Sequence, residues 1–501
     1  MLSIIHSGSL HGIDAVPVQV EVNTGERGEL RWVIVGLPDA AVKESQNRVF
    51  SALGNCGFAL PISRTTINLA PGNLRKEGPL YDLPIALAII AATQQAKLTH
   101  ATDFLIAGEL SLSGETRPIP GAFNLALLAR KMRKRGVILP RECAQMATFV
   151  DGIEVYGIEN LREGIGFLSG TYSLQPLERD FKYETSPITN DLKNVHGQKI
   201  LKRVIEIAVA GNHNLLMMGP PGCGKSMIAK CIPDLMPPPT YEEWLDILKI
   251  QSACGLTPDT HSRRRPFRSP HHNVSDSGLI GGGMIPQPGE ISLAHNGVLF
   301  LDELPEFKRS VLEMLRQPLE NGEVSIVRTN GKLTFPCKTL CIAAMNPCPC
   351  GYFGNRQRHC TCSQKQIQQY RSRVSGPLLD RFDLQIEVQP VNLSAFQTNA
   401  EEESTQDVRS RILAARQRQL SRCQQCNADL SATQLESSCR CSIHDLIWLQ
   451  NACQQLQLSA RAYHKVLKIG RTIADLEASE NIQQRHLMEA MQYRCFDRAW
   501  K

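Results

Sequence analysis

Residues 214–226 read NLLMMGPPGCGKS, an apolar run that ends in a glycine-rich turn and a Lys-Ser pair. The turn matches the pattern GxxxxGK followed by Ser or Thr, and it stands between a predicted buried strand, 214–218, and a predicted helix that begins at Lys225. In such a loop the backbone N–H groups and the helix N-terminus face the phosphates of a nucleotide. Lys225 is expected to neutralise the β- and γ-phosphates of ATP, and Ser226 is expected to bind Mg²⁺. The residues of the predicted phosphate-binding loop are Gly219, Pro220, Pro221, Gly222, Cys223, Gly224, Lys225 and Ser226.

A second apolar stretch, 297–303 (GVLFLDE), ends in two carboxylates. Asp302 at the strand tip can complete the Mg²⁺ shell, and Glu303 can polarise the attacking water. A third apolar strand, 339–344, is followed by Asn346, which either orients that water or forms the turn before Pro347. The pairing of the loop with the two carboxylates predicts hydrolysis of ATP rather than binding alone.

Length and composition limit the remaining possibilities. The 501 residues are too many for one ordinary core, and 42% apolar with 21% charged residues is typical of a folded globular chain. The longest apolar run, 83–92, is shorter than the roughly 20 residues of a membrane span, and no export signal is found. We therefore expect a cytoplasmic protein without membrane contact, whose 17 cysteines are reduced thiols or metal ligands.

The pattern along the chain predicts an α/β protein with distinct domains. Strands are expected at 18–22 and 32–35, and helices at 42–53, 404–420 and 461–478. Residues with Pro, Ser, Thr and charge but no periodicity mark a linker. The expected domains are 1–170 (α/β), 171–190 (linker), 191–392 (α/β nucleotide-binding core) and 393–501 (helical).

Five segments, GPPGCGKS, GVLFLDE, AAMNPCPCG, SGPLLDRFD and LSARAYHKVLKIGRTIADLE, together resemble the magnesium-chelatase-like AAA+ ATPases, and within them the competence protein ComM (YifB) group. The resemblance spans nearly the whole chain, including HGIDAVPVQVEV and VGLPDAAVKES near its start. It implies an AAA+ P-loop NTPase module with a helical lid, preceded by a Lon-protease-like α/β domain of the S5 domain 2 type.

The resemblance also implies roles for single residues. Asn346 corresponds to the sensor 1 position, Arg381 to an arginine finger that reaches the γ-phosphate of a neighbouring subunit, and Arg461 to sensor 2 on the lid. An arginine supplied by a neighbour stabilises transition-state charge. The implied assembly is a ring, most simply a homo-hexamer.

The same resemblance predicts that the N-terminal domain has no peptidase activity. In the Lon-like family the peptidase uses a serine and a lysine, and the matching positions in RKEGPLYDLP and GETRPIPGAF are Leu80 and Phe123. Neither side chain can act as nucleophile or base.

Two regions are candidates for DNA contact. Residues 323–335, with Asn330-Gly331 at a tight turn, predict a β-hairpin, and the resemblance places such a hairpin and the insert 279–290 near the pore of the ring. Lys332 is therefore either a DNA contact or an ordinary surface lysine. The arginine-rich segment 263–273 suits either phosphate contacts or structural ion pairs. The candidate DNA-binding residues are Lys332, Arg263, Arg264, Arg265 and Arg268.

Two groups of cysteines have spacings that a metal site could use. Cys348, Cys350, Cys360 and Cys362 form two close pairs directly after Asn346, and four thiolates can close a tetrahedral Zn²⁺ site. The alternative is buried thiols without a metal. For a second set we favour incidental cysteines, although a second zinc is conceivable. This set comprises Cys423, Cys426, Cys439 and Cys441.

These features predict an ATP-hydrolysing ring that moves on single-stranded and branched DNA, with helicase or branch-migration activity during uptake and recombination of foreign DNA. The ATPase part follows from the residues, whereas the DNA part follows mainly from the resemblance. The alternatives are a chelatase-type or other protein-remodelling ATPase that does not act on DNA, and a Lon-like ATP-dependent protease.

Overall fold

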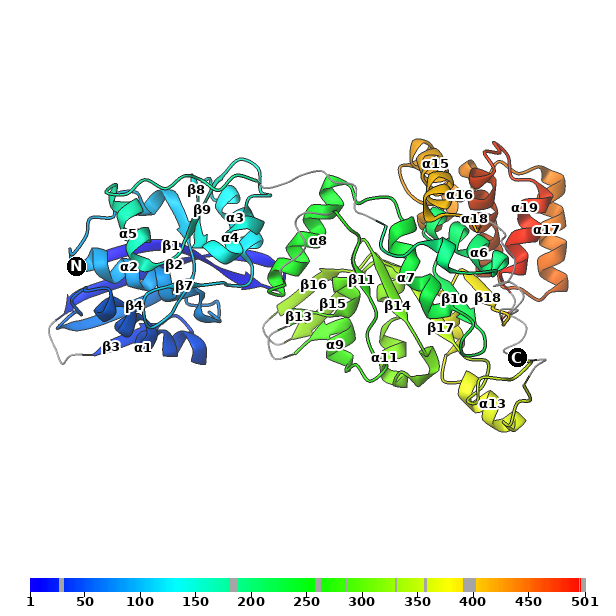
Figure 1. The fold of residues 1–501 in the computed structure, drawn as a ribbon, viewed down its shortest axis with the longest axis horizontal. Coiled ribbons are helices and arrows are strands. Elements are labelled where there is room, and N and C mark those ends of the chain that lie inside the picture. Colours follow the sequence, from blue (N-terminus) through cyan, green and yellow to red (C-terminus); the bar gives the residue numbers. More distant parts are fainter. Residues whose placement is uncertain are drawn as a thin grey trace. The chain divides into compact units, whose positions relative to one another are not determined.

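The structure is a computed structural model that describes residues 1–26, 31–179, 188–256, 263–283, 286–328, 331–355, 358–390, 402–494 and 496. The chain divides into two compact units (Figure 1). The N-terminal unit comprises Met1–Glu184 and Tyr241–Ser262, and the C-terminal unit comprises Thr185–Thr240 and Arg263–Lys501. The first boundary between them falls within residues 171–190.

The N-terminal unit is built around a mixed four-stranded sheet with the strand order β1-β2-β4-β3. In β2 the fully buried Val18, Val20 and Val22 alternate with Gln19 and Glu21, which is the period of a strand with one face in the core. The predicted strands at 18–22 and 32–35 are confirmed. The strands are β1 (Leu2–His11), β2 (Asp14–Glu26), β3 (Trp32–Val35) and β4 (Arg64–Ala70).

A three-stranded parallel sheet, a two-stranded antiparallel sheet and five α-helices complete the α/β arrangement of the described residues within 1–169. The helix predicted at 42–53 is confirmed as α1, and the Asp39 side chain caps it by accepting from the Val42 N–H at 2.7 Å. The additional strands are β5 (Phe104–Ile106), β6 (Glu109–Leu110), β7 (Thr116–Arg117), β8 (Gly136–Pro140) and β9 (Glu154–Ile158). The helices are α1 (Ala40–Asn55), α2 (Asp82–Ala92), α3 (Ala122–Lys131), α4 (Arg141–Ala147) and α5 (Leu161–Ser169).

A sixth helix of this unit comes from a distant part of the chain. Helix α8 (Tyr241–Ala253) places Trp244, Ile247 and Leu248, an apolar stripe at helical spacing, in the N-terminal core. It packs on α3, where the backbone N–H of Phe123 donates to the Ser252 hydroxyl at 3.1 Å. The sequence alone predicts a continuous core over 191–392, and the structure differs because this apolar face is matched to α3.

The C-terminal unit contains a five-stranded parallel sheet with the order β11-β14-β17-β10-β18. Its central strands are buried along their whole length, as expected for a parallel sheet covered on both faces. The three apolar strands predicted around 214–218, 297–303 and 339–344 are confirmed. The sheet strands are β10 (Leu215–Met218), β11 (Phe267–Arg268), β14 (Val298–Leu301), β17 (Leu340–Met345) and β18 (Leu384–Glu387).

Two small hairpins and a set of helices surround this sheet. The hairpin predicted at 323–335 is confirmed by β15 pairing with β16, while Asn330 of its predicted turn lies outside the described residues. The hairpin strands are β12 (Gly281–Gly282), β13 (Gln287–Pro288), β15 (Glu323–Arg328) and β16 (Gly331–Pro336). The helices are α6 (Lys199–Gly211), α7 (Lys225–Leu235), α9 (Asp276–Ile280), α10 (Glu290–Leu293), α11 (Arg309–Met314), α12 (Pro318–Asn321), α13 (Gln364–Arg371) and α14 (Gly376–Leu379).

The C-terminal helices follow the sheet and pack on α6 and α7 (Figure 1). Ser404 begins the first of them with a capping box to Asp407, and the helices predicted at 404–420 and 461–478 are confirmed. Within the described stretch 402–494 no strand is found. The helices are α15 (Thr405–Cys423), α16 (Ala432–Ser438), α17 (Ile443–Gln455), α18 (Ala460–Leu476) and α19 (Gln484–Gln492).

Among the residues that the structure describes, no helix combines the length and apolar character that a membrane span requires.

We predict that Trp244→Ala destabilises the N-terminal unit by about 3–5 kcal/mol, because it leaves a large cavity between α8 and α3. Hydrogen exchange followed by mass spectrometry should show faster exchange in α3 but unchanged exchange in β10. Glu242→Ala, on the exposed face of the same helix, is the control and should change neither. Unchanged protection of α3 in Trp244→Ala would contradict the placement of α8 in this core.

Candidate functional site

The phosphate-binding loop joins β10 to α7. Its backbone turns through Gly222 and Gly224, whose φ angles of 78° and 88° are left-handed and favour glycine. The loop leads directly into the N-terminus of α7. The first N–H groups of a helix have no partners within the helix, so they are available to a ligand in the loop. The local structure is therefore the anion-binding geometry that the sequence predicts.

Lys225 lies inside this loop and is 7% exposed. Its Nζ donates to the carbonyl oxygens of Gly219 at 2.7 Å and Pro220 at 2.9 Å, and it lies 3.4 Å from Asn346 Oδ1. Asn346 directly follows β17, the strand beside β10. The structure thus brings together the lysine and the asparagine that the sequence singles out, 121 residues apart.

Ser226 and Asp302 also meet. The Ser226 hydroxyl donates to Asp302 Oδ2 at 2.6 Å, and the other oxygen of Asp302 accepts from the Glu303 N–H at 3.0 Å. A hydroxyl and a carboxylate side by side at a helix N-terminus are the oxygen ligands that Mg²⁺ takes in phosphate sites. This donor set fits Mg²⁺.

The first cysteine group forms a compact cluster next to the loop. The four Sγ atoms of Cys348, Cys350, Cys360 and Cys362 lie within 4.8 Å of one another. The separations are 3.4 Å between Cys348 and Cys350, 3.6 Å between Cys348 and Cys360, and 3.5 Å between Cys350 and Cys360. Tetrahedral zinc with Zn–S bonds of about 2.3 Å separates its sulfurs by about 3.8 Å, so the cluster fits this ion.

Backbone N–H groups also point at these sulfurs. Those of Phe353 and Cys350 donate to the Sγ atoms of Cys348 and Cys362 at 3.3 and 3.4 Å. The same loop closes on the phosphate-binding loop, because a Cβ added at Gly351 would lie 2.7 Å from Pro221 Cδ. The cluster therefore supports both the loop after Asn346 and the outer side of the nucleotide site.

Arg381 and Arg461 converge on one carboxylate, Glu320 at the end of α12. Arg381 is ion-paired with Glu320, and Arg461 lies 3.1 Å from its other oxygen. Burial and the neighbouring Arg461 cation lower the pKa of Arg381 from its ordinary value. Glu320 and Arg461 are about half exposed, so the cluster reaches the surface.

This arginine cluster lies at the amino-terminal ends of the strands, whereas the phosphate-binding loop lies at their carboxyl-terminal ends. The backbone oxygen of Arg381 accepts from the side chain of Asn214, which stands directly before β10, whereas the loop begins directly after β10. A four-residue strand spans about 13 Å. Arg381 therefore faces away from the nucleotide site of its own chain.

An ion pair connects the residue before β18 to the C-terminal helices. Lys465 of α18 lies 2.9 Å from Asp383, and His213 lies 3.5 Å from the same carboxylate. Burial opposes ionisation, but Lys465 and His213 hold the pKa of Asp383 well below its ordinary value. Because Arg461 stands one turn before Lys465, this pair also positions the arginine cluster.

Comparisons with known proteins match nearly the whole chain. Residues 191–396 match the family described as magnesium chelatase, subunit ChlI; residues 18–143 match subunit ChlI of Mg-chelatase; and residues 402–494 match the ChlI C-terminal family. Competence protein ComM of Haemophilus influenzae is 42% identical, covering 99% of this chain and 98% of ComM. YifB of Escherichia coli is also 42% identical, with the same coverage. The chain belongs to the ComM/YifB family of magnesium-chelatase-like AAA+ ATPases.

Membership of the ComM/YifB family makes the chain a magnesium-chelatase-like AAA+ ATPase, and it implies ATP and Mg²⁺ at the site described above. The predicted family is therefore confirmed. The predicted α/β class is confirmed as well, and the sheet of the C-terminal unit is parallel.

The arginine-rich segment is occupied by contacts within the chain. Arg264 forms an ion pair with Asp234 at 2.5 Å. Arg268 donates two hydrogen bonds to the Glu290 carboxylate, at 2.6 and 2.7 Å. Arg265 donates to two backbone oxygens, those of Pro237 and Asn296, both at 2.6 Å. These three arginines therefore make the structural pairs that the sequence analysis gives as the alternative to phosphate contacts. Arg263 also takes part in an interaction within the structure.

The predicted hairpin at 323–335 lies beside the insert 279–290, since β12 of the insert packs against β15. Lys332 is exposed on β16 and pairs with Val327, which is 71% exposed. Residues 284 and 285 of the insert lie outside the described residues. The hairpin end therefore presents a cation beside an apolar side chain.

Leu80 and Phe123 are buried in the core of the N-terminal unit, with exposures of 5% and 1%. Neither position offers a nucleophile or a base to a substrate. The second cysteine set does not cluster within the described residues: Cys423 contacts Ser438 at 2.9 Å, and Cys439 contacts the Leu467 carbonyl at 3.8 Å.

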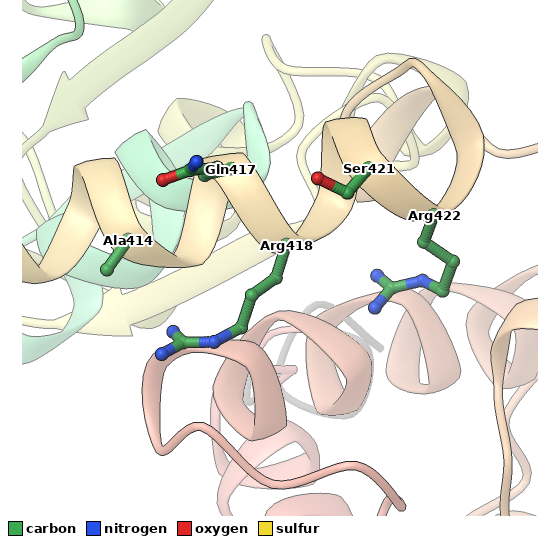
Figure 2. A pocket seen from close by; sticks show the side chains of 5 residues that line it. All are labelled: Ala414, Gln417, Arg418, Ser421 and Arg422. Atoms are coloured by element: carbon green, nitrogen blue, oxygen red, sulfur yellow. The ribbon is translucent and has the colours of Figure 1, made fainter.

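A surface hollow of about 560 Å³ lies along α15 (Figure 2). Arg418 and Arg422 extend from the same side of the helix, and both bind Asp475, Arg418 through its backbone oxygen at 2.8 Å and Arg422 through its carboxylate at 2.8 and 2.9 Å. The two arginine cations that line the hollow are therefore paired within the C-terminal helices.

Sequence reasoning missed two residues that contact the predicted site residues. Glu320 joins the two arginines, and His272 lies 3.4 Å from Glu303. Glu320 has no signal in the sequence, because its role depends on the meeting of α12 and α18. His272 has a weak signal in the sequence, because it is a histidine that closely follows β11, the strand beside β14.

Proposed function

We propose that the chain is an ATP-driven DNA motor. In this proposal a ring, most simply a homo-hexamer, hydrolyses ATP to move on single-stranded and branched DNA, with helicase or branch-migration activity on recombination intermediates in natural transformation. The observation that carries the ATPase half is the meeting of Ser226 with Asp302 beside the loop that holds Lys225. The ComM relative is named a competence protein, which supports the DNA half.

Each residue of the site has a separate role in the proposed hydrolysis of ATP. Lys225 would exchange its carbonyl partners for the β- and γ-phosphates, and Ser226 and Asp302 would hold Mg²⁺, which would neutralise phosphate charge. Glu303 accepts a proton from the attacking water, and Asn346, within reach of Lys225, orients that water. Each role uses a group that already lies at the carboxyl edge of the sheet.

Arg381 and Arg461 serve the nucleotide of a neighbouring copy. Both guanidinium groups lie with Glu320 at the edge opposite to their own loop and close to the surface. Cations that stabilise the transferred phosphoryl group must reach the γ-phosphate. The position of this cluster therefore supports a ring in which each site lies between two copies.

The two neighbouring hairpins are the proposed DNA contact. Lys332 provides a cation for the phosphate backbone, and the exposed Val327 beside it provides apolar contact to bases. Both lie on a hairpin that directly precedes β17, whose end carries Asn346. A shift of this hairpin on DNA can therefore be transmitted to the nucleotide site.

The cluster of Cys348, Cys350, Cys360 and Cys362 is a proposed structural Zn²⁺ site. A closed set of four protein ligands leaves no open position for substrate, which is the pattern of structural zinc. Zinc would hold the loop after Asn346 against the phosphate-binding loop, with the Gly351 and Pro221 contact as its consequence.

We predict that single-stranded or branched DNA stimulates ATP turnover by this chain. Lys225→Ala should abolish nucleotide binding, while Glu303→Gln should retain binding and lower turnover by about 100-fold or more, because it removes the general base. Turnover can be measured with single-stranded, double-stranded and branched DNA at fixed salt, with fluorescent ATP analogues to follow binding. ATP turnover that no DNA changes would contradict the motor and favour a protein-remodelling ATPase.

Mixing two inactive variants tests the position of the arginines. Arg381→Ala should lower turnover about 1000-fold, as loss of an arginine finger does. A mixture of Arg381→Ala with Lys225→Ala should regain activity, because the first supplies an intact nucleotide site and the second supplies an intact arginine. The matched control is a mixture of Lys225→Ala with Glu303→Gln, in which no site is complete. Equal activity of the two mixtures would place Arg381 in its own site.

Metal analysis tests the zinc site. Freshly purified protein should contain zinc, and Cys360→Ser should lower its content because four-fold thiolate coordination is broken. Cys423→Ser, which alters a cysteine outside the cluster, should leave the content unchanged. A fresh preparation free of zinc would remove this assignment.

A further inference from the structure

The hollow along α15 is lined by hydrogen-bond donors and by no acidic side chain among the residues that the structure describes there. Its lining consists of Ala414, Gln417, Arg418, Ser421 and Arg422 (Figure 2). The amide, the hydroxyl and both guanidinium groups of this set can all donate hydrogen bonds. A hollow with donors and without carboxylates is suited to an anion.

One carboxylate, Asp475, pairs with the arginines at the hollow, and its acceptor sites are filled. It accepts two hydrogen bonds from Arg422, at 2.8 and 2.9 Å. Arg471 and Asn427 donate two more, at 3.0 and 2.8 Å. A carboxylate offers about four acceptor sites, and Asp475 is 1% exposed. Two guanidinium groups therefore share one negative charge, which leaves a surplus of positive charge.

Arg418 adds a further cation to this surplus. Its bond at 2.8 Å goes to the backbone oxygen of Asp475, which carries no net charge, and the side chain is exposed. Among the described residues no carboxylate forms an ion pair with Arg418. A guanidinium group has five N–H donors, so most of those of Arg418 are available to a ligand. The Nε–H group of Arg422 also has no hydrogen-bond partner among the described residues, which adds to the positive field.

The size of the hollow suits a nucleotide unit rather than a single ion. Its volume of about 560 Å³ falls within the roughly 300–1,000 Å³ of sites that hold organic ligands. The planar fork of a guanidinium group matches two oxygens of a phosphate. Because the lining lies on the exposed face of one helix, a ligand that continues as a chain beyond the hollow fits as well.

The hollow is separate from the hairpins that are the proposed DNA contact. Helix α15 packs on α6, α7 and α18, whereas β15 packs on β12 and α12. Figure 1 shows α15 and the hairpin of β15 and β16 in different parts of the C-terminal unit. A branched DNA molecule has more than one strand, so two separate sites can hold two of its strands.

We propose that the hollow on α15 binds the phosphate backbone of a second DNA strand, with Arg418 as the main phosphate ligand and Gln417 and Ser421 as further donors. This inference rests on the proposed action on branched DNA and adds a second contact to it. Arg418 keeps its bond to the end of α18 and binds phosphate oxygens with its remaining N–H groups. Such a contact contributes affinity without reading the base sequence.

The test introduces one carboxylate into the hollow of the full-length chain. Ala414 lies on the exposed face of α15, one turn before Arg418, where a glutamate pairs with the arginine and suits the helix. Ala414→Glu should lower the affinity for a three-way branched DNA about fivefold or more at low salt. It should also reduce the slope of log K against log salt concentration by about 1, because one phosphate contact is lost.

Ala414→Gln is the matched control, since it has the same size and no charge, and it should keep the wild-type affinity and slope. A short single-stranded oligonucleotide should bind equally to all three proteins, because the hairpins hold it. An equal loss of affinity for this oligonucleotide in Ala414→Glu would overturn the assignment of the hollow to a second strand.

Arg418→Ala provides an independent measurement and should weaken binding of branched DNA as Ala414→Glu does. Arg440→Ala, which removes an exposed arginine of the same helices that is ion-paired with Glu480, should have no effect. If Arg418 merely caps α18, Arg418→Ala lowers the melting temperature while Ala414→Glu leaves the affinity for branched DNA unchanged, and this result would overturn the proposal. Failure of the proposed motor is recognised separately, as wild-type protein that binds branched DNA without faster ATP turnover.

A free phosphate compound is the other source of the same chemical group. Inorganic pyrophosphate should not raise the melting temperature of Lys225→Ala, whose nucleotide site is disabled. A rise that the added substitution Ala414→Glu abolishes, together with unchanged affinity for branched DNA, would assign the hollow to a free phosphate compound and overturn the DNA strand as its ligand.

Discussion

The parallel arrangement of β14, β17 and β10 is the constraint on which the nucleotide site depends. Because parallel strands place their carboxyl ends at one edge, Asp302, Asn346 and the loop after Met218 arrive at the same place from three separate stretches of the chain. The contacts of Ser226 with Asp302 and of Lys225 with Asn346 are consequences of that edge. The cysteine cluster follows Asn346 and lies at the same carboxyl-terminal ends of the strands.

The two arginines lie at the amino-terminal ends of the strands of the same sheet, away from the phosphate-binding loop of their own chain. Arg381 stands before β18 and Arg461 stands on α18, and the buried pair of Asp383 with Lys465 joins these two elements. The cations are therefore positioned as firmly as the loop, but at the other end of the strands. In the proposed ring, the loop of one copy and the two arginines of the next copy together complete a site.

Local patterns in the sequence predicted the parts of the fold that depend on neighbouring residues. The apolar strand before Gly219, the helix from Lys225 and the two carboxylates after Leu301 all follow from runs of a few residues. Long-range packing was not predictable in this way. The stripe of Trp244, Ile247 and Leu248 fits any apolar partner, and only the structure shows that this partner is α3. The arginine-rich segment likewise suited DNA and ion pairs equally until Asp234 and Glu290 were found beside it.

The dependence of ATP turnover on protein concentration tests most directly whether each site is shared between copies. Turnover per chain should be measured over a range of dilution, together with the mass distribution of the particles in the same buffer, ATP and salt. If the arginines of one copy complete the site of the next, turnover per chain falls on dilution in step with loss of the ring. Turnover per chain that stays constant down to the monomer would contradict a shared site and would require Arg381 and Arg461 to have another role.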